Sequence, residues 1–199
     1  MTGARPEGLA ISGSATNGVR ILNGTISNFG TAVSLASTEH VVIRDMTFDG
    51  NDNGVHVGLG AAVKDSYFHQ TASFDAAVIA GEGSVLDHCI FRFNDISARM
   101  GPGSLVTYNV SKRGNEDGII VGEKSVVIGN SVFDTYDEGL RVGARSTVVN
   151  NNVFGSGAGD LYITCPSNVM GNSAGSLALS NRDQEASCKF SDNLFLGEY

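Results

Sequence analysis

The sequence lacks tryptophan and has little proline, little charge and no long apolar run. It contains no Trp and only three Pro among 199 residues, and charged residues are 17% of the chain. The usual share is about a quarter. The absence of proline runs and of charged blocks argues against disorder, a collagen-like chain and a coiled coil. No apolar stretch approaches the roughly 18 residues of a membrane span, and residues 1–13 have no apolar signal-peptide core.

The charge balance narrows the choice of partner. Lys and Arg number 13 against 21 Asp and Glu, which gives a net charge of −8. A negative chain is a poor ligand for nucleic acid or an anionic membrane, so we expect neither as a partner. Hydrophobic residues make up 41%, enough for one domain with a core over residues 1–199.

A segment of about 21 residues recurs along the chain, and each copy opens with a short strand of period 2. We aligned the copies on the last residue of that strand, which gives Ile26, Phe48, Phe68, Phe91, Lys112, Phe133, Phe154, Gly175 and Phe195. A second strand follows in each copy, and a Gly ends most of these strands, as at Gly58, Gly81, Gly101, Gly122 and Gly143. No stretch has helical periodicity. Parallel strands repeated at a short period without helices predict an all-β solenoid.

Polar residues recur three positions before this column, mostly as Asn, as at Asn109, Asn130, Asn151 and Asn172. A stacked Asn can hydrogen-bond to its copy in the next coil. From residue 19 to 199 the pattern resembles the NosD-like repeat of the pectin lyase-like superfamily. The resemblance implies a right-handed parallel β-helix of about eight to nine coils, in which 1–18 form an incomplete N-terminal coil and 165–199 the closing coils. That superfamily includes lyases, hydrolases, epimerases, tail spikes and non-catalytic binders, so the resemblance leaves the chemistry open.

The chain has three cysteines, and they divide into two kinds. Cys89 falls on an inward position, so we expect it in the core. Cys165 and Cys188 are about one coil apart, and neighbouring coils lie within disulfide reach. A Cys165–Cys188 disulfide would indicate a secreted or extracytoplasmic protein. The alternative is two reduced thiols in a cytosolic protein.

An acidic stripe precedes the second strands, and its densest part comprises Asp95, Glu116, Asp117, Asp137 and Glu138. Coils about 5 Å apart bring these like charges close together. Calcium takes 6–8 oxygen ligands, so one prediction is a Ca²⁺ site here. The alternative is a solvated turn with local hydrogen bonds.

Basic and aromatic residues gather around the end of the first strands. Our catalytic candidates are Lys112, Arg113, Arg92 and His69, with Tyr67 beside them as a substrate-binding candidate. Lys112 occupies the Phe column in this alignment, where desolvation would lower its pKa and suit a general base. The alternatives are a Lys stem that fills the Phe space and a salt-bridge ladder with the nearby acids.

A further outward stripe runs through the second strands, with Arg99, Arg141 and Tyr162 as further substrate-binding candidates. Two Arg side chains suit the carboxylates of an acidic polysaccharide. The stripe also contains Ile79 and Ile120, which we expect to be exposed and which would suit an oligomer interface instead.

These features lead to one main hypothesis, a polysaccharide-active protein that works as a calcium-assisted uronate lyase by β-elimination. Compact pectate lyases of polysaccharide lyase family 3 are similar in size and coil number. The Asp-Pro-His-Asp motif of mannuronan epimerases is absent. The alternatives are a non-catalytic carbohydrate-binding or assembly module, in line with the short turns, and a truncated fragment of a larger β-helix enzyme. A homo-oligomer through the uncapped N-terminal end or through a β-helix face is also open.

Overall fold

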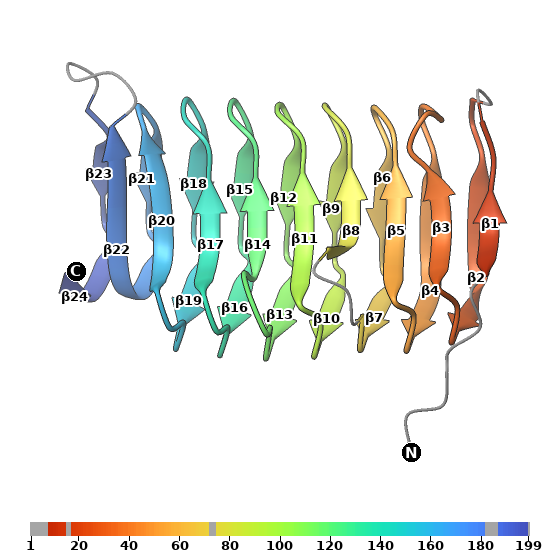
Figure 1. Cartoon of the computed structure of the whole chain (residues 1–199). Helices are drawn as coiled ribbons and strands as arrows, with labels where there is room; N and C mark the ends of the chain where they lie inside the picture. The colour runs from red at the N-terminus through yellow and green to blue at the C-terminus, as the bar shows by residue number, and fades with distance from the viewer. Residues whose placement is uncertain (1–7, 15–16, 72–74, 182–186, 199) are drawn as a thin grey trace.

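The computed structural model describes residues 8–14, 17–71, 75–181 and 187–198, and it is a stack of parallel strands (Figure 1). Each complete coil contributes one strand to each of three sheets, one strand more than the two that the sequence predicted, because a turn divides the predicted first strand in two. Every strand pairs in parallel with the strand one coil away. The described residues form no helix long and apolar enough to cross a membrane.

The strands of sheet 1 face the viewer in Figure 1. They are β1 (Leu9–Ser12), β3 (Thr31–Leu35), β5 (Asn53–Val57), β8 (Ala76–Ala80), β11 (Ile96–Met100), β14 (Ile119–Val121), β17 (Glu138–Val142) and β20 (Gly159–Cys165). The short strands of sheet 2 are β6 (Ala62–Lys64), β9 (Val85–Asp87), β12 (Leu105–Thr107), β15 (Val126–Ile128), β18 (Thr147–Val149), β21 (Asn168–Met170) and β23 (Lys189–Ser191).

Sheet 3 is formed by β7 (Tyr67–His69), β10 (Ile90–Arg92), β13 (Val110–Lys112), β16 (Ser131–Phe133) and β19 (Asn152–Phe154). At the N-terminal end, β2 (Arg20–Ser27) and β4 (Val42–Asp49) each run through sheets 2 and 3. At the C-terminal end, β22 (Ser173–Asn181) begins beside β19 and continues beside β20, and β24 (Leu194–Glu198) pairs with it.

A buried asparagine ladder sets the register at the turn between sheets 2 and 3. In each step the side chain of one Asn accepts a hydrogen bond from the backbone N–H of the Asn one coil before, at 2.9–3.0 Å. The ladder comprises Asn109, Asn130, Asn151, Asn172 and Asn193. The predicted inter-coil bonds of the first four are therefore confirmed, but the fifth rung is Asn193 and not Asp192. Cys89 holds the same position one coil before Asn109, because its N–H bonds to the Asn109 side chain at 2.9 Å.

The ladder corrects our alignment of the Phe column. The Phe48, Phe68 and Phe91 rings stack in the core with centroids 4.8 and 5.0 Å apart. Phe91 then pairs with Ser111, and Arg92 pairs with Lys112. The coil between Cys89 and Asn109 is one residue shorter than we assumed, so Lys112 is half-buried on the outer side and does not occupy the Phe space. Ser111 is buried there and lies 2.7 Å from the Ser97 hydroxyl, Oγ to Oγ.

Two further predictions about the core are confirmed. Cys165 and Cys188 form a disulfide between adjacent coils, with their Cα atoms 5.0 Å apart. Cys89 is a free, buried cysteine, and burial raises the pKa of its thiol to about 12.

The Gly column also has a physical cause: a Cβ built on Gly122 would lie 2.6 Å from the backbone nitrogen of Pro102.

Candidate functional site

The outer face of sheet 1 carries the stripe that the sequence predicts. Register pairs join its members one coil apart along the solenoid axis: His56, Ile79, Arg99, Ile120, Arg141 and Tyr162. We call these residues the sheet-1 stripe. Ile79 and Ile120 are half-buried, not exposed as expected. Cationic and apolar side chains therefore alternate along β8 to β17.

The surface is hollowed at the C-terminal part of this stripe. A hollow of about 540 Å³ is lined by residues of β14, β17 and β20 and of the turns that follow them, including Ile120, Arg141 and Tyr162. The Arg141 guanidinium lies over the Tyr162 ring, 5.3 Å from its centroid. A planar cation on an aromatic ring offers both a charge and a flat surface to a ligand. A second hollow of about 230 Å³ lies near the other end of sheet 1, beside His56 and Ile79.

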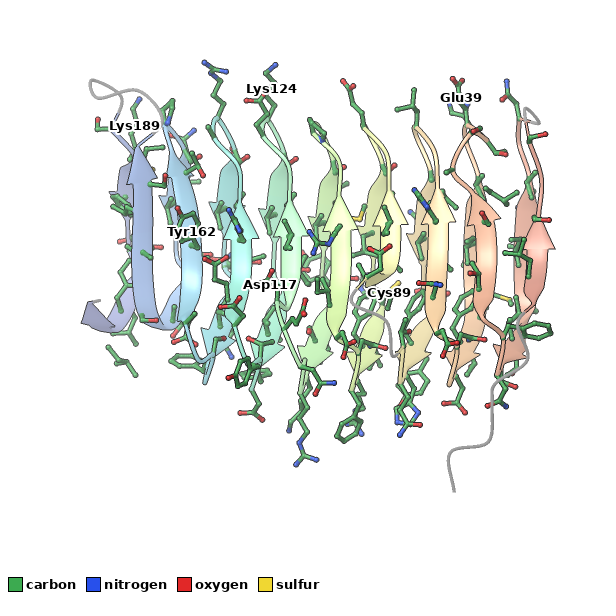
Figure 2. The ribbon with its side chains drawn as sticks, viewed as in Figure 1. Glu39, Cys89, Asp117, Lys124, Tyr162 and Lys189 are labelled. Carbon is green, nitrogen blue, oxygen red and sulfur yellow. A yellow bond between two sulfur atoms is a disulfide. The ribbon has the colours of Figure 1, made fainter. Side chains whose placement is uncertain are left out.

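Two carboxylates lie beside the stripe where the strands of sheet 1 begin. The backbone N–H of Glu138 donates to Asp117 Oδ1 at 3.1 Å, and Arg141 Nη1 lies 3.4 Å from Glu138 Oε2. Burial raises the pKa of Asp117, and the charge of Asp137 adds to that shift. Burial also raises the pKa of Glu138, against the opposing charge of Arg141. Figure 2 shows Asp117 and Tyr162 on the same side of the solenoid, at sheet 1.

The residues predicted to bind calcium do not gather into a metal site. Asp95, Glu116, Asp117, Asp137 and Glu138 lie in neighbouring coils, as expected. Yet among the residues that the structure describes, no three His, Cys, Asp or Glu side chains lie close enough to hold a metal ion. Asp95 instead accepts a hydrogen bond from Asn115 Nδ2 at 2.8 Å. The calcium site therefore stays a prediction, and no chemical step is derived through it.

The predicted catalytic residues lie on sheet 3. Register pairs align Asp49 with His69, His69 with Arg92, and Arg92 with Lys112. His69 Nδ1 lies 2.7 Å from Asp49 Oδ1, which favours the tautomer with the proton on Nδ1. The predicted substrate-binding residue Tyr67 also lies here, with its ring 5.9 Å from that of His69.

Phe93 joins this cluster, and the sequence reasoning missed it. Its ring lies 5.7 Å from the His69 ring, edge to face, and 5.5 Å from the Arg113 guanidinium carbon. Together with Arg92 and Lys112, Phe93 and Arg113 line a hollow of about 120 Å³. The sequence feature that could have indicated Phe93 is its position at the turn, directly after Arg92 and directly before the buried Asn94.

The two groups of candidates therefore occupy different faces. Arg99, Arg141 and Tyr162 lie on sheet 1 with the acidic residues Asp117 and Glu138, as the register pairs show. Lys112, Arg113, Arg92, His69 and Tyr67 lie on sheet 3 or on the turn that follows it. In the described part of the chain, none of the hollows named above contains residues of both groups. On sheet 1, Arg141 connects the two features, since it lines the larger hollow and lies 3.4 Å from Glu138.

Comparison with known protein families shows to which family this chain belongs. A family described as the right-handed β-helix region matches residues 31–195. The chain belongs to this right-handed β-helix family. No curated protein matches the sequence significantly.

Solved structures of other right-handed β-helix proteins resemble this chain in fold. One is the periplasmic alginate epimerase AlgG, with 14% identity over 93% of this chain and 51% of that chain, at a TM-score of 0.59. Another is the A-module of the mannuronan C-5 epimerase AlgE4 from Azotobacter vinelandii, with 12% identity over 92% of this chain and 74% of that chain, at a TM-score of 0.53. The chain spans about half the length of AlgG. At this identity the likeness establishes the fold alone.

Proposed function

We propose that this β-helix binds an acidic polysaccharide along the sheet-1 stripe and acts on its uronate units by removing the proton from C5. The observation that carries the proposal is the pair of carboxylates with raised pKa, Asp117 and Glu138, next to Arg141 at the hollow. The fold likeness to two epimerases of uronate polymers supports the choice of substrate class. The disulfide supports a secreted or extracytoplasmic location.

The residues supply each part of such a step. Arg141 pairs with the uronate carboxylate and stabilises the negative charge that develops when C5 loses its proton. Glu138, whose raised pKa makes it a stronger base than an ordinary Glu, takes the proton. In β-elimination the electron pair of the C5–H bond forms the C4=C5 double bond, the C4–O bond breaks, and the leaving oxygen takes a proton from Tyr162. In epimerisation the C4–O bond stays intact, Glu138 keeps the proton that it removed, and C5 takes a proton from Tyr162 on the opposite face.

Arg99 extends the site along the polymer axis. It lies two coils from Arg141, with Ile120 between them, so about 10 Å separates the two backbones. A polymer that carries a carboxylate on every sugar can contact both cations at once. Binding over several coils supports a polymer as ligand more than a single sugar.

The test is an exchange and cleavage assay on alginate and pectate. We expect ultraviolet absorbance from an unsaturated product, or deuterium at C5 after incubation in D₂O, and Glu138→Gln should lower either signal at least 100-fold. The matched control is Glu82→Gln, because Glu82 is an exposed acid on the opposite turn. Parallel runs with calcium and with chelator test the predicted metal dependence.

Two other results would redirect the proposal. Suppose that alginate gels retard the wild type, that Arg141→Gln abolishes the retardation, and that no exchange at C5 is found. The chain is then a binding module, the alternative that the short turns favour. If Lys112→Gln or His69→Ala abolishes activity while Glu138→Gln does not, catalysis lies on sheet 3, as the sequence predicted. No retention and no reaction on any uronate polymer would refute the proposal.

A further inference from the structure

Three cationic side chains converge on the small hollow at the edge of sheet 3. Arg92 and Lys112 are register partners in adjacent coils, and Arg113 follows Lys112 on the turn. These three and Phe93 line the hollow of about 120 Å³. In Figure 1 this edge lies at the ends of β10 and β13, away from the face of sheet 1 that points toward the viewer.

The three cations have no ion-pair partner among the residues that the structure describes. Although the net charge is −8, no ion pair in the described residues involves Arg92, Lys112 or Arg113, whereas seven other pairs occur there. On the N-terminal side of the cluster, Asp49 of sheet 3 is paired with His69 at 2.7 Å. Asp134, one coil beyond Arg113, makes no ion pair with it. Like charges brought together in adjacent coils repel each other, so a bound anion would stabilise this arrangement.

The backbone supplies an independent observation. Phe93 and Arg113 have φ of 55° and 60°, in the left-handed region. At the same turn of other coils lie Asn28, Gly50, Asp134 and Gly155, which tolerate this conformation, and Gln70, which has a φ of 53°. A bulky residue in this region is strained, and Tyr108, Lys124 and Arg145 adopt it at other turns of the solenoid. At the turn after β10 and β13 the conformation brings an aromatic ring and a guanidinium to the rim of one hollow.

We propose that Arg92, Lys112, Arg113 and Phe93 form a binding site for a single anionic group, a phosphate, a sulfate or a uronate carboxylate. Guanidinium groups bind such oxyanions through two parallel hydrogen bonds, and Lys112 adds a point charge. Phe93 supports the Arg113 guanidinium by stacking, which limits its freedom before binding. The hollow is too small for a larger ligand, so it holds one charged group. The site lies on another face than the proposed polysaccharide site and does not depend on it.

The experiment is thermal unfolding of the full chain with inorganic phosphate, sodium sulfate or glucuronate, at constant ionic strength adjusted with NaCl. A ligand that binds only the folded chain raises Tm, while sulfate also stabilises proteins without a site. The measured quantity is therefore the rise in Tm that the anion causes in the wild type, compared with the rise that it causes in each variant. We expect Lys112→Gln and Arg92→Gln to lose the specific rise, and the control Arg44→Gln, on sheet 2, to keep it. The anion that raises Tm most in the wild type relative to the variants identifies which anionic group the site binds.

A second variant separates binding from folding. Arg113→Asn places a residue that tolerates φ near +60° at the strained turn, so we expect its Tm without anion to rise by about 2–4 °C while the specific anion response disappears. A lower Tm together with an unchanged anion response would show that Arg113 is structural. Equal anion responses in the wild type and in every variant would overturn the proposal.

Discussion

Removal of one rung of the asparagine ladder tests the register on which both sites depend. Asn130 is fully buried, and its side chain makes five hydrogen bonds of 2.9–3.2 Å along the turn. It accepts from the backbone N–H and the Nδ2 of Asn109, and it donates to Val106 O, Ile128 O and Asn151 Oδ1. Asn130→Ala removes all five bonds at once.

The expected loss of stability follows from the polar groups that Asn130→Ala leaves without a hydrogen-bond partner. The backbone N–H and one Nδ2 hydrogen of Asn109 lose their acceptor, and Val106 O loses a donor. A buried polar group without a partner costs about 1–3 kcal/mol. Partial relaxation of the turn offsets some of this cost, so we expect Asn130→Ala to lower the free energy of unfolding by about 3–5 kcal/mol. For a chain of this size the corresponding fall in Tm is roughly 6–20 °C.

The assay is urea unfolding followed by circular dichroism, with Asn168→Ala as control. Asn168 is an exposed residue on sheet 2, and such a substitution changes stability by no more than about 0.5 kcal/mol. If Asn130→Ala also loses less than about 1 kcal/mol, the ladder does not hold the coils in register, and the outward alignment of Lys112 with Arg92 loses its main support.

Three more predictions address the disulfide, the buried carboxylates and the glycine column. Reduction, or Cys165→Ser, should lower the free energy of unfolding by about 2–4 kcal/mol, given the 23-residue separation; an unchanged urea midpoint with dithiothreitol would contradict this. Burial raises the pKa values of Asp117 and Glu138 above their usual 3.8 and 4.5. The folded chain therefore binds more protons than the unfolded chain once the pH exceeds these usual values, and the contribution of the two groups to stability falls as the pH rises further. Glu138→Gln should therefore gain Tm relative to the wild type as pH rises from 4 to 7 in a series of melts, and a constant difference would show that the pKa is not raised. Gly122→Ala forces a Cβ to 2.6 Å from Pro102 N and should cost about 1–3 kcal/mol, while Gly24→Ala, whose Cβ would meet nothing closer than 3.7 Å, should leave the urea midpoint nearly unchanged.

The sequence predicted the architecture because every coil obeys the same physical constraint. Inward positions must be apolar and strands must alternate, so a period of about 21 residues appears in the sequence itself. The stripe through Arg99 and Arg141 was predicted correctly because β8 to β20 align without insertion between the inward residues and the Gly column. The disulfide followed from the same coil spacing.

The site on sheet 3 could be predicted only in part, because a one-residue difference in coil length moves a side chain between the core and the surface. Phe133 and Phe154 look like core residues, yet Phe133 is the register partner of Lys112 and Phe154 that of Phe133, and both are half-buried on the outer side. The residue that settles the matter is Asn109, whose side chain bonds to the Cys89 N–H. Sequence alone cannot show whether His88 or Cys89 aligns with Asn109. A serine ladder at the other turn, which includes Ser104, Ser125 and Ser146, was missed for the same reason.

The corrected register changes the chemistry assigned to Lys112. A lysine buried in a phenylalanine stack would have a depressed pKa and would serve as a base. Lys112 is instead half-buried on the outer side, where it lines one hollow together with Arg92 and Arg113. A group of cations around one hollow suits the binding of an anion. On sheet 1, burial raises the pKa values of Asp117 and of Glu138, which lies beside Arg141, and this suits the proton abstraction that we propose there. The two proposals thus place anion binding on one face of the solenoid and acid–base chemistry on another.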